Sequence, residues 1–125
     1  MTINESERVA PIRIKDAETN HTYILDFSRE TVQFAEDRGF DWDLVGTKPG
    51  TLIPLIWFCA FRRYDRRISY EKTTQMLEDL GGMRTDWLKR LRALYDQSMA
   101  SLIADPDKEE DEEAAKNAKL TVSLD

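Results

Sequence analysis

The feature that most constrains the fold is LIPLIWFCAFRRYDRR, residues 52–67, in which an almost unbroken apolar run meets four arginines. A membrane-spanning helix needs about 20 predominantly apolar residues. Residues 52–61 supply half of that and include Pro54, so we expect no membrane span. A short segment that is apolar on all sides is typical of a helix covered by its neighbours. The sequence predicts a central buried helix from about Thr51 to Arg66, in whose first turn a proline is tolerated.

Before this helix, residues 11–27 alternate in two short runs. Ile12 and Ile14 form the first run, a polar turn segment DAETN follows, and Tyr23, Leu25 and Phe27 form the second. Apolar residues at a period of two, on both sides of a turn, predict a β-hairpin.

Three further helices are expected from capping residues and helical spacing. Ser28 can cap a short helix that Gly39 ends, and Ser69 can cap another that ends at Gly81 and Gly82. The second of these helices places Tyr70, Thr73, Leu77 and Leu80 on one face. A last helix, from about Thr85 to Ile103, repeats apolar residues at helical spacing: Trp87, Leu88, Leu91, Leu94, Tyr95, Met99 and Leu102.

Charge separates the end of the chain from its body. The chain has 125 residues and a formal net charge of -6, and residues 105–125 hold eight acids and three lysines, hence -5. We expect a flexible N-terminus (1–10), one globular domain (11–104, with the hairpin at 11–27 and the helices at 28–104) and a disordered acidic tail (105–125). The fold class is α+β, mainly α: an N-terminal β-hairpin packed on a compact bundle of about four helices.

The residue pattern favours no enzyme. His21, the single histidine, falls in or beside the hairpin loop, where an exposed turn residue is favoured over a general base. Cys59, the single cysteine, lies in the apolar run, where burial would raise its pKa and hide its sulfur. Asp41 and Asp43 alone are too few oxygen ligands for calcium. We therefore predict no catalytic residue, no cofactor and no metal site.

The arginines after the apolar run leave several readings open: Arg62, Arg63, Arg66 and Arg67. At a helix C-terminus they suit the negative end of the dipole. They could also receive an acidic protein segment, of which the chain's own tail is one candidate. Nucleic-acid binding is the minority alternative, because the chain as a whole is acidic.

The order of these elements resembles the small tail assembly chaperones of long-tailed (siphovirus-type) bacteriophages. The segment HTYILDFSRETVQFAEDRGFDWD is similar to their strand, first helix and Gly-aromatic break. LIWFCAFRRYDRRISYEKTTQMLEDLGG is similar to their apolar helix and the Ser-capped helix that follows. WLKRLRALYDQSMASLI would be the closing helix, so the resemblance covers about residues 12–104.

The resemblance implies a non-enzymatic virion-assembly protein of the host bacterial cytoplasm, absent from the mature virion. It would bind the phage tape measure protein, keep it soluble and help recruit the tail-tube protein, and it could form a homo-oligomer. The predicted partner-binding residues are the four arginines and one face of the last helix: Arg62, Arg63, Arg66, Arg67, Trp87, Leu91, Tyr95 and Met99. For most of the helix residues a place in the core is the favoured alternative. The competing function is a small phage or bacterial regulator that binds nucleic acid through Arg62–Arg67.

Overall fold

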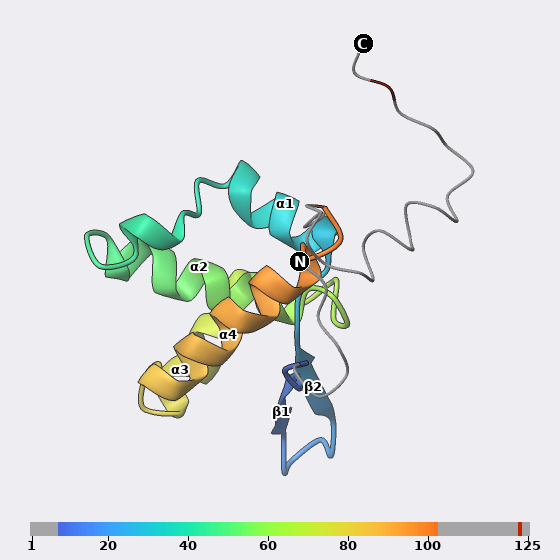
Figure 1. Ribbon diagram of the computed structural model, residues 1–125. Coiled ribbons are helices and arrows are strands. Elements are labelled where there is room, and N and C mark those ends of the chain that lie inside the picture. The colour runs from blue at the N-terminus through green and yellow to red at the C-terminus, as the bar shows by residue number, and fades with distance from the viewer. Residues whose placement is uncertain (1–7, 103–122, 124–125) are drawn as a thin grey trace.

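The computed structural model describes residues 8–102 and 123. Figure 1 shows a hairpin below a group of helices, which confirms the predicted α+β, mainly α fold. The elements are β1 (Ile12–Lys15), β2 (Thr22–Leu25), α1 (Arg29–Asp37), the short 3-10 helix η2 (Trp42–Leu44), α2 (Pro49–Phe61), α3 (Tyr70–Asp79) and α4 (Thr85–Ser98). The predicted acidic tail lies outside the described residues, except for Ser123, which is exposed.

The hairpin forms in the predicted place. Its two antiparallel strands pair Ile12 with Leu25 and Ile14 with Tyr23, so the alternating apolar residues share one face. Tyr23 and Leu25 are buried against the helices. In the turn, the Asp16 carboxylate accepts a hydrogen bond from the N–H of Glu18 at 2.9 Å.

Helix α1 begins and ends through the predicted local signals. The Ser28 side chain accepts from the N–H of Thr31, and the Thr31 hydroxyl accepts in return from the N–H of Ser28, which satisfies two N–H groups at the helix start. At the other end Gly39 has a φ of 86°, and the N–H of Phe40 donates to the carbonyl of Ala35 at 3.0 Å. This closure is a glycine-dependent helix stop.

Helix α2 is the buried central helix, but its predicted ends were wrong. It begins at Pro49, so this proline takes the first helical position and Pro54 lies inside the helix rather than in its first turn. It ends at Phe61 rather than Arg66. Beyond Phe61 the side chains of residues 62–67 are exposed or half-buried.

Helices α3 and α4 complete the bundle. Ser69 caps α3 as predicted, and Gly81 and Gly82 after it both have positive φ. The predicted apolar face of α3 is buried only at Thr73 and Leu77, whereas Tyr70 and Leu80 are 43% and 44% exposed.

Helix α4 ends at Ser98, earlier than predicted; Leu102 is exposed and Ile103 lies outside the described residues. The described fold reaches back before residue 11, because the side-chain amide of Gln97 bonds both the N–H and the carbonyl of Val9.

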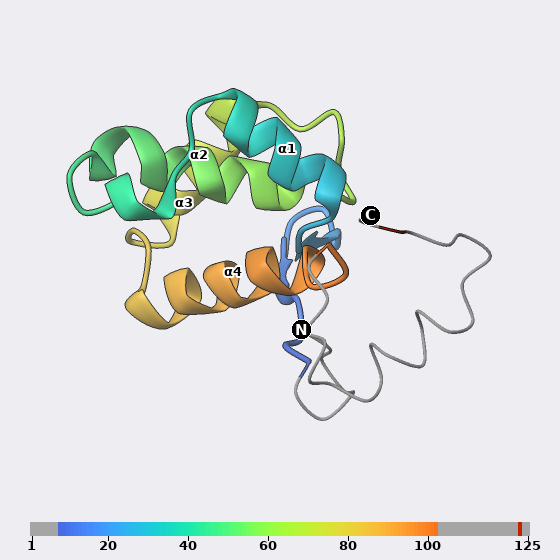
Figure 2. The same cartoon turned by 45° about the horizontal axis from the view of Figure 1, so that its top comes forward.

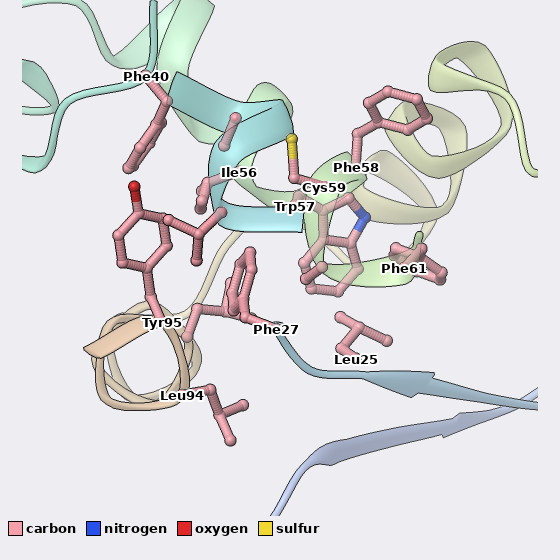
Figure 3. Packing of buried hydrophobic residues seen from close by; sticks show 14 of the residues in the cluster. Leu25, Phe27, Phe40, Ile56, Trp57, Phe58, Cys59, Phe61, Leu94 and Tyr95 are labelled. Carbon is pink, nitrogen blue, oxygen red and sulfur yellow. The ribbon is translucent and has the colours of Figure 1, made fainter. Parts of the chain in front are cut away.

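The core surrounds α2. Figure 2 shows α4 crossing beneath the layer formed by α1 and α2. Figure 3 shows side chains from β2, α2 and α4 converging between these layers. Trp57 is fully buried, and its indole N–H donates to the carbonyl of Thr73 on α3 at 2.8 Å. No helix in the described part of the chain is both long and apolar enough to cross a membrane.

Candidate partner-binding site

The connection between α2 and α3, residues 62–69, contains the four predicted arginines. We call this segment the arginine connection. Two surface hollows border it, and Arg66 lines both. The smaller, of about 100 Å³, is lined by Ser28, Glu30, Thr31, Phe34, Arg62, Arg63 and Arg66. The larger, of about 510 Å³, is lined by His21, Tyr23, Asp65, Arg66, Arg67, Ile68, Ser69 and Lys72.

Arg63 has a structural role within the domain. Its Nη1 donates to Oδ2 of Asp26 at 2.7 Å and to the carbonyl of Phe27 at 3.0 Å. Asp26 is only 8% exposed, and a buried carboxylate is costly unless a cation or donors compensate it. Arg63 therefore joins the end of α2 to the segment between β2 and α1.

Arg62 and Arg66 also contact neighbouring parts of the domain. The guanidinium of Arg62 lies 4.1 Å from the centroid of the Phe34 ring, and its Nη1 donates to the carbonyl of Arg66 at 3.1 Å. Arg66 pairs with Glu30 at 2.9 Å. Both members of this pair are well exposed, so it contributes little stability and a partner could replace it.

The larger hollow contains a contact that the sequence did not reveal. Nε2 of His21 lies 3.2 Å from Oδ1 of Asp65, and the His21 ring meets the Tyr23 ring edge-on with centroids 4.5 Å apart. His21 is exposed beside the turn, as expected. The two partners are 44 residues apart, and no local pattern reports such a pairing.

Two further cations line the larger hollow. Arg67 and Lys72 form no ion pair within residues 8–102. Lys72 also lies in the first turn of α3, where backbone N–H groups carry partial positive charge. The positive charge of Lys72 also interacts with Asp16 of the hairpin turn. The pKa of Asp16 is lowered mainly by hydrogen bonds from the N–H groups of Glu18 and Thr19, and to a smaller degree by Lys72. The hollow thus suits carboxylates better than cations.

Exposed tyrosines at the arginine connection were missed in the sequence. Tyr64 is 52% exposed and Tyr70 is 43% exposed. The Arg63 guanidinium lies 5.2 Å from the Tyr64 ring centroid, and Tyr70 packs edge-on against Phe58. Tyrosine and arginine are enriched in protein interfaces. The signal available in the sequence was that Tyr64 and Tyr70 lie within a few positions of the four arginines.

The predicted residues of α4 lie apart from this site, in or against the core. Leu91 is fully buried, and Tyr95 is 5% exposed and packs against Phe27 with ring centroids 5.3 Å apart. Trp87 stacks on Trp57 with ring centroids 6.1 Å apart, and Met99 is partly buried. This face of α4 closes the core, which was the favoured alternative for most of these residues.

The surroundings of the single cysteine and of the possible metal ligands bear on the chemistry open to residues 8–102 and 123. Cys59 is fully buried, and this burial raises the pKa of its thiol to about 12, so the reactive thiolate is suppressed at neutral pH. Within residues 8–102 and 123, no group of three or more His, Cys, Asp or Glu side chains could hold a metal ion.

Comparison with known proteins gives one family. The model described as "Domain of unknown function (DUF5055)" matches residues 3–124. The chain belongs to this family. No curated protein and no solved structure matches the chain. The DUF5055 match includes the hairpin, all four α-helices and most of the acidic tail, so body and tail fall within one family unit.

Proposed function

We propose that the protein is a non-enzymatic tail assembly chaperone of a long-tailed bacteriophage. It binds the tape measure protein in the host cytoplasm, keeps it soluble and helps recruit tail-tube subunits. The observation that carries the proposal is the order of elements and breaks. A hairpin, a Ser-capped helix ending at Gly39, an apolar helix, a second Ser-capped helix and a closing helix follow one another, as the resemblance to those chaperones implies.

The surface at the arginine connection supports binding of a protein partner. Tyr64 and Tyr70 are exposed there, and Arg67 and Lys72 line the adjoining hollow. Exposed tyrosines in and directly after a connection that borders a hollow lined by cations suit a partner helix that carries apolar and acidic residues. We therefore assign partner binding to this surface, and the buried face of α4 to stability.

The nucleic-acid alternative receives less support from the same geometry. Arg63 is held by Asp26 and Arg62 by Phe34, whereas the exposed pair of Arg66 with Glu30 is weak. Each phosphate contact needs a cation that can leave its own partner. Of the four arginines, Arg67 alone has no ion pair or cation–π contact within residues 8–102.

Co-expression with the tape measure protein of the same phage tests the proposal. We expect a soluble complex that a tagged copy of either protein recovers. The double variant Tyr64→Ala/Arg67→Ala should weaken recovery at least about tenfold, because exposed interface tyrosines and arginines can each contribute more than 1 kcal/mol. Lys89→Ala, an exposed change on α4, is the matched control. If no complex forms and both proteins are soluble alone, the proposal is wrong.

A further inference from the structure

We propose that the acidic segment 105–113 of the same chain binds in the larger hollow, where it competes with any acidic partner. This inference rests on charge and reach within the chain and does not depend on the proposed chaperone role. It assigns the acidic segment a regulatory role beyond solubility.

The charges of the hollow favour an acidic occupant. Arg66, Arg67 and Lys72 line it together with one carboxylate, Asp65, which His21 contacts. Arg66 already pairs with Glu30, so of these three cations Arg67 and Lys72 have no ion pair within residues 8–102. Opposing charge comes from Asp16, which lies near enough to Lys72 for its pKa to respond. With Glu30 and Asp16 counted and His21 taken as neutral, these charges sum to zero, so an acidic occupant is attracted by Arg67 and Lys72 and not by a net positive charge.

The segment 105–113 is the complementary ligand in charge. Seven of its nine residues are acidic and one is a lysine, whereas the rest of the chain is nearly neutral. Each exposed ion pair contributes little by itself. A short tether presents the segment at an effective concentration in the millimolar range, so a millimolar affinity already gives half occupancy.

The end of α4 lies within reach of the hollow. Helix α1 connects the two places: it contacts α4, and Glu30 in its first turn pairs with Arg66. Figures 1 and 2 both show the end of α4 and the α2–α3 connection beside the start of α1. Residues 105–113 follow Leu102 by three to eleven residues, which corresponds to about 10–40 Å of extended chain.

Zero-length carbodiimide cross-linking of the full chain, read by mass spectrometry, tests this contact. We expect amide links between Lys72 and acids within 105–113. Lys89, an exposed lysine on α4, is the matched control and should link to this segment at least about fivefold less. Equal linking at both lysines, or none at Lys72, would overturn the proposal.

Mixing unlabelled and ¹⁵N-labelled chains before cross-linking distinguishes the source of the segment. Links within one chain join peptides of the same isotope and support the proposal. Mixed-isotope links in the statistical proportion mean that a second copy supplies the segment, and the proposal is then wrong.

A charge-neutralised full-length variant gives an independent readout. In Glu109→Gln/Glu110→Gln/Asp111→Asn/Glu112→Gln/Glu113→Gln, we expect the backbone amide resonances of residues 67–72 to move relative to the native chain. The difference should vanish in about 1 M salt, where the Debye length falls to about 3 Å. Resonances that coincide at low salt would contradict the inference and leave the chaperone proposal unaffected.

Discussion

Arg63 Nη1 lies 2.7 Å from Oδ2 of Asp26 and so ties the end of α2 to the junction between β2 and α1. The other carboxylate oxygen of Asp26 accepts from the N–H of Phe27 at 2.8 Å. The cation therefore neutralises a carboxylate that is itself fixed to the backbone, at a point where three elements meet.

Replacing Arg63 by Ala should lower the free energy of unfolding by about 2–4 kcal/mol, because the buried Asp26 carboxylate loses its cation. Urea denaturation with circular dichroism measures this. Arg66→Ala breaks the exposed pair with Glu30 and should cost about 0.5 kcal/mol or less. If the two variants were equally stable, Arg63 would not have the structural role described above.

Replacing Trp57 by Phe should lower the free energy of unfolding by about 2 kcal/mol. The change removes both buried ring volume and the hydrogen bond to the Thr73 carbonyl. Trp87→Phe is the comparison, since Trp87 stacks on Trp57 but is only partly buried. Thermal and urea unfolding should rank Trp57→Phe as clearly more destabilising, and the reverse order would refute this view of the core.

Replacing Gly39 by Ala should cost about 1 kcal/mol. Gly39 has a positive φ, and a Cβ there would meet no atom within 4 Å, so the cost is backbone strain and not a clash. Gly46→Ala is matched to it, because a Cβ at Gly46 is equally unobstructed and its φ is not in the left-handed region. Urea midpoints should separate the two variants, and equal midpoints would contradict the argument.

Stability should fall as the pH rises from about 9 toward 12. Burial raises the pKa of Cys59 from 9.0 to about 12, so in this range the unfolded chain releases a proton that the folded chain retains. Ionisation therefore stabilises the unfolded state, by up to about 1.4 kcal/mol per pH unit.

The alkaline effect can be checked by urea unfolding of the native chain and of Cys59→Ala between pH 7 and 10. The variant should be less stable at pH 7, because it loses buried volume, but it should lose less stability on going to pH 10. Tyr95, whose pKa burial raises to about 12, contributes to both proteins. Parallel pH profiles would show that the Cys59 thiol is not linked to folding.

Sequence reasoning succeeded where the signal is local. Ser28, Gly39 and Ser69 act on backbone groups a few residues away, so their roles follow from neighbouring letters. The alternation in residues 12–25 fixed the hairpin face for the same reason. The predicted C-terminal end of α2 was wrong because the sequence continues into arginines, which are themselves good helix formers.

The candidate site was only partly predictable. The four arginines are adjacent in sequence, so their gathering at one surface was expected. The ion pairs that these arginines form depend on residues far away in the sequence. Asp26 is 37 positions from Arg63, and Glu30 is 36 positions from Arg66. The pairing of His21 with Asp65 has the same origin. Burial of Leu91 and Tyr95 was the favoured alternative from their helical spacing, whereas the contact of Tyr95 with Phe27 joins distant parts of the chain and is not contained in that pattern.

The double hydrogen bond between Gln97 and Val9 has a topological consequence. It holds the start and the end of the described fold against each other across 88 positions. A short linker could therefore join the two ends and leave the packing intact, with new termini opened at the exposed hairpin turn. In such a chain the elements would follow one another in a different order, while their packing in space would stay the same.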